Sequence, residues 1–318
     1  MVLSPGHRHS RLFFGFYSLT NTASSKLAMQ LKHVPASRLF VSEPDPSWFG
    51  NPPNEIPSQN WLESRFHFSF AEYSNRLNSN FGVLRVMNDD FVQPNRGFGT
   101  HGHANMEIIT YIVQGKLTHK DSMGTEETLG RGSVQFMTAG RGVQHSEFNL
   151  EKDTGLRFIQ TWIVPRRDGL FPQYGSFDPD HYGEKSRNRN ICTARNQWRH
   201  LVSDTQDTSS DTPVRIEQDA NLFVAEMDAD QSLDFLFKND RMAYVLCVEG
   251  SVNLITDSGN KVTLHRHDGC EVKPGGGRGD MTLTFNTIGS EEVEGGDLSA
   301  HVLMFEVAHV EGSGRHDL

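Results

Sequence analysis

The stretch THGHANMEIITYIVQG, residues 100–115, places two histidines directly before a run that is typical of a β-strand. His101 and His103 are separated by one residue, so an extended backbone points both side chains to one face. A single imidazole on such a face is commonly a packed side chain. Two imidazoles in register indicate a shared ligand, such as a metal ion.

A second pair of the same kind begins 44 residues after His101. This separation is long enough for the chain to form a hairpin and return beside the first pair. His145 and Glu147 also stand two residues apart and therefore share a face. Neighbouring strands lie about 5 Å apart, so the two pairs can surround one ion with three imidazoles and a carboxylate. The structural alternative is a set of histidines that are hydrogen-bonded within a polar barrel mouth.

Beyond these pairs the chain is rich in short apolar or alternating runs, separated by Gly, Asn or Asp. Such spacing favours an all-β sandwich or barrel over alternating strands and helices. The runs are FGVLRVM, EIITYIV, SVQFMTA, LRFIQTWIV, NLFVAEM, AYVLCV, SVNLIT, TLTF and HVLMFEV.

An internal repeat predicts two related barrels. TYIVQGKLTHKDSMG (110–124) aligns with VLCVEGSVNLITDSG (245–259) at an offset of 135 residues. The next turn glycine is Gly132 in the first copy and Gly269 in the second, which makes the second copy two residues longer there. Each copy therefore predicts a strand, a glycine turn, a strand, a second glycine turn and a further strand.

The second copy lacks the two pairs. The offset places Leu236 and Lys238 at the positions of the first His pair, and Thr282 and Thr284 lie near the place of the second pair. Leu236 has no lone pair to offer, and Lys238 would repel a cation. We therefore expect metal only in the first copy, and a structural or recognition role for the second.

These patterns divide the chain into four segments. We expect a leader at 1–30, a metal-binding barrel at 31–182, a junction at 183–212 with a helix around 194–204, and a metal-free barrel at 213–318. Residues 1–42 hold basic but no acidic side chains, and the serine-rich leader resembles an organellar transit peptide. An untargeted leader, or a start at Met29, is the alternative, with a cytoplasmic or nuclear location.

Charge and composition exclude several classes of protein. The chain has 30 basic and 40 acidic residues, a net charge of -10, which argues against direct nucleic-acid binding. Its apolar runs are too short for a membrane-spanning helix. The cysteines Cys192, Cys247 and Cys270 show no paired spacing, and an odd number favours buried thiols in a reducing compartment.

The two histidine-containing stretches resemble the two cupin motifs. Residues 101–115 have the first motif, H-x-H followed by E and G, and residues 132–149 have the second, in which Thr138 replaces the usual proline. Two extra residues also precede the histidine of the second motif. These two departures, together with HKDSMG, TAGRGVQHSEFN, FHFSFAEY and QTWIVP, resemble the pirin family over residues 31–310. The resemblance implies a bicupin fold, two stacked barrels of the double-stranded β-helix type. It also implies that the four residues of the two pairs ligate the metal and that Glu107 does not.

The resemblance implies a function as well. Three neutral imidazoles and one carboxylate suit Fe, Ni, Cu, Mn or Zn, and the family favours one Fe(II). A pirin-like quercetin 2,3-dioxygenase would bind a flavonol and dioxygen, with Glu147 as base for the 3-hydroxyl proton. The alternative is a non-catalytic, iron-dependent regulator that acts through a protein partner. Oxygen uptake with quercetin would favour the enzyme.

The remaining polar and aromatic signals have simpler interpretations. We expect His119 to lie at the surface after its glycine turn, and Asn88–Asp90 to form a turn rather than a catalytic carboxylate pair. Glu107 is expected to be a neighbour of the ligands or solvated. The aromatic residues expected in the core, rather than on a substrate platform, are Phe68, Phe70, Phe98 and Trp162.

Overall fold

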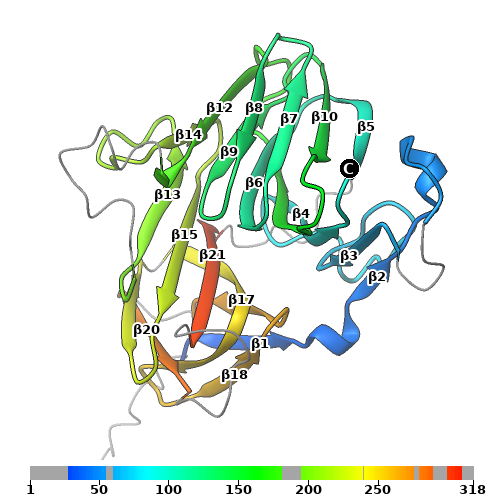
Figure 1. Cartoon of the computed structure of the whole chain (residues 1–318). Coiled ribbons are helices and arrows are strands. Elements are labelled where there is room, and N and C mark those ends of the chain that lie inside the picture. The colour runs from blue at the N-terminus through cyan, green and yellow to red at the C-terminus, as the bar shows by residue number, and fades with distance from the viewer. Residues whose placement is uncertain are drawn as a thin grey trace, which may run out of the picture.

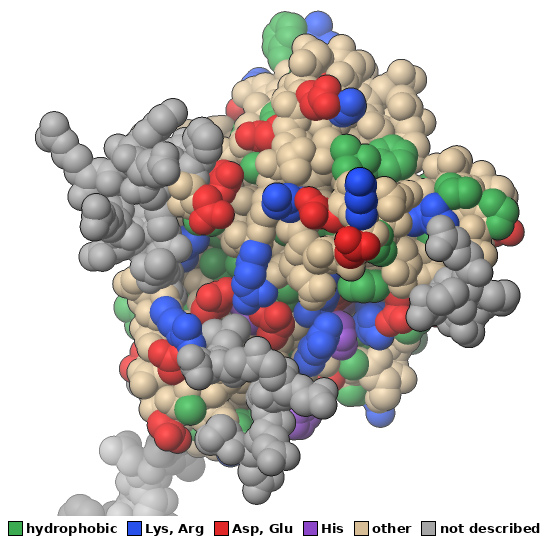
Figure 2. Space-filling model, viewed as in Figure 1, with side chains coloured by type: hydrophobic (Ala, Val, Ile, Leu, Met, Phe, Trp, Pro, Cys, Tyr) green, Lys and Arg blue, Asp and Glu red, His purple; other side chains and the backbone are tan. Residues whose placement is uncertain are grey.

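The computed structural model describes residues 28–54, 60–180, 195–238, 240–275, 279–288 and 299–309. Almost all of the expected leader, the first part of the expected junction, and Cys192 lie outside these residues. The described chain forms two barrels of strands that pack against each other (Figure 1). In these ranges no helix is long and apolar enough to cross a membrane. On the face seen in Figure 2, basic and acidic side chains are interspersed rather than gathered by sign.

The first barrel consists of a seven-stranded and a four-stranded sheet. The larger sheet has the order β12 (Gln173–Phe177), β9 (Val134–Thr138), β6 (Glu107–Gln114), β11 (Leu156–Ile163), β4 (Leu84–Val92), β3 (Leu62–Phe66) and β2 (Phe40–Ser42). The smaller sheet has the order β5 (Arg96–His103), β10 (Val143–Asn149), β7 (Leu117–Asp121) and β8 (Glu126–Leu129). Two short 3-10 helices precede β3, namely η1 (Ala36–Arg38) and η2 (Pro46–Phe49).

The second barrel is built on a ten-stranded sheet. Its main path is β1 (Gln30–Val34), β19 (Gly269–Lys273), β17 (Arg241–Thr256), β21 (Ala300–Ala308), β15 (Ala220–Met227), β13 (Arg199–Asp204) and β14 (Val214–Ile216). Off this path lie β16 (Ser232–Phe237), β18 (Lys261–His265) and β20 (Met281–Thr287). All nine apolar runs lie on strands, so the all-β prediction is confirmed. Cys247 and Cys270 are buried free thiols.

The strand registers repeat between the two barrels at the predicted offset. Thr110 of β6 lies opposite Gln135 of β9, and 135 residues later Val245 of β17 lies opposite Cys270 of β19. The strand pair β6 and β7 of the first barrel corresponds to the single long β17 of the second, with the same order of partners. Side-chain direction alternates along a strand, so an identical register preserves which positions face inward. The internal repeat is therefore confirmed residue by residue here.

The turn before β19 differs from its prediction. The shared register makes Gly269 the counterpart of Val134, and His267 the counterpart of Gly132. Both turn residues have left-handed backbones, with φ of 78° at Gly132 and 72° at His267. The second copy is thus not longer at this point, because a histidine occupies the left-handed position that usually favours glycine.

Two strands lie in places that the sequence did not indicate. β1 pairs antiparallel with β19, with Gln30 opposite Lys273, so it lies in the second barrel although residues 31–182 were expected to form the first. β13 occupies the expected junction, where a helix was predicted around 194–204. The helix prediction is wrong, because β13 lies between β15 and β14 and pairs with both. Pairing with distant strands outweighs the weak local preference of such a segment.

A shared apolar core joins the barrels. Alternate residues of β6 point away from the interior of the first barrel and pack against β17 of the second. The contacting side chains include Ile109, Tyr111 and Val113 on β6, and Tyr244, Leu246 and Val248 on β17. The other face of β6 carries Thr110 and looks into the first barrel. The second barrel has a separate interior that is lined by apolar side chains.

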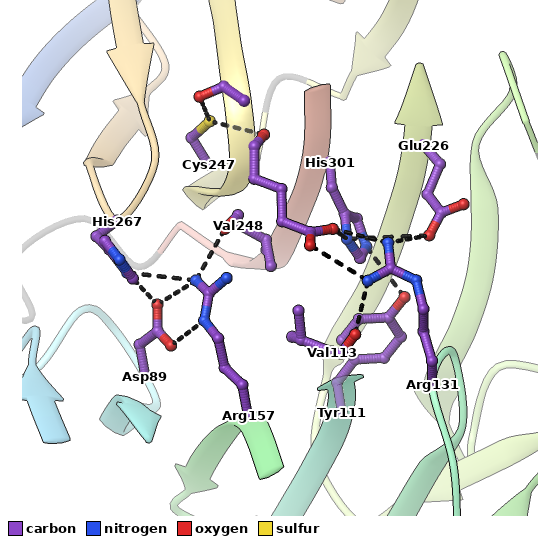
Figure 3. A network of polar contacts seen from close by, with 12 residues as sticks. Asp89, Tyr111, Val113, Arg131, Arg157, Glu226, Cys247, Val248, His267 and His301 are labelled. Carbon is purple, nitrogen blue, oxygen red and sulfur yellow. Dashed lines mark hydrogen bonds and ion pairs between the residues drawn. The ribbon is translucent and has the colours of Figure 1, made fainter. Parts of the chain in front are cut away.

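A buried ion pair of the first barrel lies at the same interface (Figure 3). The Arg157 guanidinium donates to both oxygens of Asp89, at 2.8 and 2.7 Å, and to the carbonyl oxygen of Val248 in the second barrel at 2.8 Å. His267 Nδ1 lies 2.6 Å from Asp89 Oδ2. Burial alone would raise the pKa of Asp89, but Arg157 and His267 hold it well below its usual range. A side chain of each barrel therefore meets one buried carboxylate.

A second polar cluster lies beside this joint (Figure 3). His301 Nδ1 is 2.9 Å from Glu249, and its Nε2 is 3.0 Å from the Tyr111 hydroxyl of the first barrel. Arg131 reaches across from the first barrel and donates to Glu249 and to Glu226. Tyr111 and Arg131 of the first barrel thus contact polar side chains of the second barrel at this joint.

Candidate metal centre

The antiparallel pairing of β5 and β10 brings the two predicted pairs together. His101 lies directly opposite His145, and a β-bulge between His145 and Glu147 shifts the register beyond it. The rings of His101, His103 and His145 have centroids 4.5 to 4.8 Å apart. One ring nitrogen from each of the three lies within 4.8 Å of those of the other two. Three imidazoles therefore converge on one point.

The nitrogens of His101 and His145 have the separation that two ligands of one ion require. His101 Nε2 lies 3.1 Å from His145 Nε2. Two nitrogens at right angles, each about 2.1 Å from an ion, are about 3 Å apart. His101 Nδ1 lies 2.8 Å from the carbonyl oxygen of Gly99, to which it can only donate, so Nε2 keeps a free lone pair.

Burial keeps His103 and His145 uncharged. Burial, with a smaller effect of the neighbouring imidazoles, lowers the pKa of His103 to about 4 and the pKa of His145 to about 3. Both rings are therefore neutral at pH 7, which is the form that binds a metal ion. The chemistry of this donor set fits a divalent transition-metal ion.

Glu147 is buried and held by amides. Gln135 Nε2 donates to its Oε1 at 2.8 Å, and Gln160 Nε2 donates to its Oε2 at 2.7 Å. The carboxylate lies within 4.8 Å of donor nitrogens of His145 and His119. The structure thus brings Glu147 beside His145, and groups it with His119 rather than with the two residues of the H-x-H pair.

His119 was expected at the surface, and this expectation is wrong. It lies on β7 directly opposite Glu147 of β10, and only 1% of its surface is exposed. Its ring stacks on Tyr174 at 4.4 Å, and its Nε2 is 3.0 Å from Asp121 Oδ2. The sequence did carry a signal for this position, because His119 and Asp121 stand two residues apart on a strand, like the two predicted pairs.

The Asn88–Asp90 segment was expected to form a turn, but it lies in the middle of β4 and is buried. β4 has partners on both sides, so its polar side chains are covered by β3 and β11. Burial raises the pKa of Asp90 to about 8, although the Ser64 hydroxyl donates to its carboxylate. Sequence reasoning missed these carboxylates because a polar triplet is typical of turns.

Glu107 belongs to neither donor group of the described residues. It lies on the face of β6 opposite to Thr110, which points toward Glu147. Glu107 is fully buried and accepts a hydrogen bond from Thr138 at 2.8 Å. Burial raises its pKa to about 7. The expectation of a solvated side chain is therefore wrong.

Aromatic side chains form one wall of the centre. The Trp162 ring lies edge-on to His103 at 4.8 Å and to Phe70 at 5.1 Å. Trp162 and Phe70 are only partly buried, whereas Phe68 is fully buried in the core shared by the barrels. Phe98 packs against a cluster on the first barrel, as expected. Trp162 thus lies next to the histidines, and Phe70 packs against Trp162.

A hollow of about 500 Å³ opens beside His103. It is lined by residues 102–104, Ser122 and residues 142–144, which are the ends of β5, β7 and β10. His101 and His103 are partly exposed, whereas His119, His145 and Glu147 are buried. A small molecule can therefore approach the cluster from the His103 side.

The corresponding positions of the second barrel are apolar. Thr256 follows Asp121 by 135 residues and is its counterpart. Asp121 lies opposite His145, and Thr256 lies opposite Leu283, so Leu283 corresponds to His145. The other strand pairs give the remaining counterparts in the same way. The counterparts of His101, His103, His145 and Glu147 are, in this order, Phe235, Phe237, Leu283 and Phe285.

The residues that the sequence comparison chose are therefore the wrong ones. Leu236, Lys238, Thr282 and Thr284 are each one position away from a counterpart. A shift of one residue turns a side chain to the opposite face of the sheet, and Leu236 is indeed 63% exposed. The constant offset of 135 fails on these strands because the loops before them differ in length between the two barrels.

Comparison with known families gives two matches along the chain. Residues 51–163 match the family described as Pirin, and residues 201–284 match the family described as Quercetinase C-terminal cupin domain. A pirin-like protein of Caulobacter vibrioides is 37% identical over 213 residues, which are 67% of this chain and 84% of that protein. The quercetin 2,3-dioxygenase of Escherichia coli K12 is 32% identical over 67% of this chain and 83% of that protein.

Solved structures show the same architecture. The bacterial pirin YhhW of Escherichia coli, in complex with nickel(II), has a TM-score of 0.66 and 26% sequence identity. The alignment covers 88% of this chain and 100% of that one. The protein GK1651 of Geobacillus kaustophilus has a TM-score of 0.63 at 16% identity, which shows a common fold.

Proposed function

Because the chain belongs to the pirin family, we propose that it is a metal-dependent dioxygenase that cleaves flavonols such as quercetin. In this proposal, a divalent metal ion is held by His101, His103, His145 and Glu147. The observation that carries it is the convergence of three imidazoles beside an open hollow, with a buried carboxylate next to one of them. The relative named quercetin 2,3-dioxygenase supports the choice of substrate.

Iron(II) is the metal that we propose for the cell. Three imidazoles and one carboxylate reduce the charge of a divalent ion to about +1, and a six-coordinate ion then keeps two positions for other ligands. The related YhhW structure contains nickel(II), so nickel is the first ion to compare. When bound, the metal supplies a Lewis acid for the flavonol 3-oxygen and a route for electrons to dioxygen.

The side chains of the centre have separate roles in this proposal. Glu147 takes the proton of the flavonol 3-hydroxyl, because its oxygens have lone pairs beyond those that accept from Gln135 and Gln160. These two amides hold the carboxylate in place during the transfer. His103 borders the hollow and contacts the Trp162 indole, against which a flat ring system would lie in this proposal.

Turnover measurements test this function. Protein purified without added metal is analysed for its metal content, loaded anaerobically with iron(II) or nickel(II), and mixed with quercetin and dioxygen. We expect loss of the flavonol, with one carbon monoxide released for each dioxygen consumed. Absence of turnover with every divalent metal that binds would overturn the proposal. Binding of a protein partner that depends on the oxidation state of iron would then favour the regulator.

A further inference from the structure

Two buried ring nitrogens near the centre, His119 Nδ1 and His145 Nδ1, have no hydrogen-bond partner among the described residues. The tautomer of His119 follows from its neighbour. The Asp121 carboxylate accepts the backbone N–H groups of Met123 and Thr125 at Oδ1, and His119 Nε2 faces its Oδ2 at 3.0 Å. Nε2 therefore carries the hydrogen, and Nδ1 of His119 has a bare lone pair inside the barrel.

The His119 ring lies among other acceptors. Glu147 is the direct cross-strand neighbour of His119, and donor atoms of His119, His145 and Glu147 lie within 4.8 Å of one another. All three side chains are at least 97% buried, since their exposed fractions are 1%, 2% and 3%. A buried lone pair without a partner is unfavourable. A cation among the three acceptors removes this cost.

We propose that His119, His145 and Glu147 form a second, inner position for a divalent transition-metal ion. Two imidazoles and one carboxylate are a donor set that binds Fe(II), Ni(II) and Zn(II). The outer position, formed by His101, His103 and His145, shares His145 with the inner one. The inference rests on the proposed metal centre only through these shared residues, and it holds whatever reaction the ion supports.

The two positions differ in their access to solvent. His101 and His103 are partly exposed beside the hollow, whereas every residue of the inner group is buried. An ion in the inner position is therefore shielded from chelators, and it leaves the hollow side of the outer histidines open. In this proposal the inner group holds the metal ion, while the outer histidines face the hollow from which a small molecule approaches.

The second barrel supplies a matched substitution for the test. Leu254 is the counterpart of His119, since it lies opposite Phe285 as His119 lies opposite Glu147. Leu254 is fully buried, so the fold accepts leucine at this place on the strand. His119→Leu therefore removes the inner nitrogen with a side chain that the same architecture already contains.

The first experiment removes the outer position. The double variant His101→Ala/His103→Ala is dialysed against Ni(II), and its nickel ligands are counted by X-ray absorption. We expect it to retain one ion with two imidazole ligands, and we expect a further His119→Leu change to weaken the affinity about tenfold or more. An ion that is absent from the double variant, or equally tight in the triple variant, would contradict the inner position.

A second experiment uses the intact outer position and does not depend on the folding of the double variant. Nickel-loaded wild-type protein and the single variant His119→Leu are mixed with a colorimetric chelator, and circular dichroism verifies that both are folded. We expect release of nickel about tenfold faster from His119→Leu. Equal rates contradict the inner position. Quercetin turnover by wild-type protein in the same preparation would show that the proposed function stands even so.

Discussion

Single hydrogen bonds decide which nitrogen of each imidazole is available in the first barrel. The carbonyl oxygen of Gly99 fixes His101, and Asp121 fixes His119, so each ring presents one bare nitrogen. Neither partner is a ligand candidate itself. The chemistry of the centre therefore depends on residues that touch no ion, as is common for metal-binding histidines.

We predict that replacing a proposed ligand lowers the metal content, whereas replacing Glu107 does not. His101→Ala and Glu147→Ala each remove one proposed donor, so metal affinity is expected to fall about 10–100-fold or more. Glu107→Gln is the matched control, because Glu107 is equally buried but faces away from the centre. Elemental analysis of the three variants after identical dialysis measures the difference.

Metal content near that of wild type in His101→Ala would count against this ligand set. So would loss of metal in Glu107→Gln with the fold intact. The pKa of Glu107 is about 7, so the neutral glutamine replaces a carboxyl group that is partly protonated already at neutral pH. The control therefore changes little besides the ability to donate an oxygen to a cation.

His67 predicts a pH dependence of stability that is independent of the metal centre. The ring is fully buried, with Nδ1 2.9 Å from the Tyr244 hydroxyl across the interface, and burial lowers its pKa to about 4. Between pH 6.5 and 4 the unfolded chain binds a proton that the folded chain does not. The free energy of unfolding therefore falls as the pH drops through this window, by roughly 3 kcal/mol in all.

The His67→Gln variant tests this assignment. Glutamine does not titrate, so the variant should lose about 3 kcal/mol of the pH dependence that wild type shows between pH 6.5 and 4. Urea unfolding of both metal-free proteins at several pH values measures it. Parallel curves for wild type and variant across this window would refute the role of His67.

At the scale of elements, β1 is expected to stabilise the second barrel. It covers the free edge of β19, and Met29 just before it is buried in the interior of that barrel. A chain that starts at Pro35 should lose at least about 2 kcal/mol of unfolding free energy, since burial of one methionine contributes about 1.5–3 kcal/mol. The exposed edge of β19 should also favour association between chains.

A chain that starts at Ala28 is the control, because it keeps both Met29 and β1. Urea unfolding and light scattering compare the two proteins. Metal content should be the same in both, since the histidines lie in the other barrel. Equal stability of the two chains would show that β1 does not contribute to the second barrel.

The sequence predicts features that depend on a local pattern, such as the shared face of two side chains on a strand. It does not predict features that depend on pairing with strands far away in the chain. The spacing of His101 and His103 is enough to place both on one face, and the strand alternation that does so holds in the structure. β13 could not be predicted, because its partners β14 and β15 follow it in the chain and its own pattern is short. His119 was missed because a glycine turn before it was taken as a sign of exposure.

The counterparts in the second barrel were misplaced for a related reason. Register is a property of two strands, and a fixed offset in sequence cannot detect an insertion in the loop between them. The strand pairs give Leu283 as the counterpart of His145, whereas the sequence alone indicates the neighbouring Thr282 and Thr284.

For the whole molecule, the ion pair of Asp89 and Arg157 predicts strong coupling between these two first-barrel residues at the interface. Both side chains are at most 2% exposed, so Arg157→Met leaves the buried carboxylate with His267 but without the guanidinium, and should cost about 3–5 kcal/mol. The double variant Asp89→Leu/Arg157→Met removes both charges and should be more stable than the single variant. A double-mutant cycle by urea unfolding measures this coupling. Additive losses would mean that the pair does not act as a unit.

The position of β1 has a consequence for biosynthesis. Gln30 leaves the ribosome long before Lys273, its partner on β19, has been translated. Domains generally fold from the N-terminus as they emerge, but this strand must wait until most of the chain has been made. The first barrel can close while β1 is still unpaired beside it. β1 can therefore pair with β19 only when the chain is nearly complete, although β1 is made first.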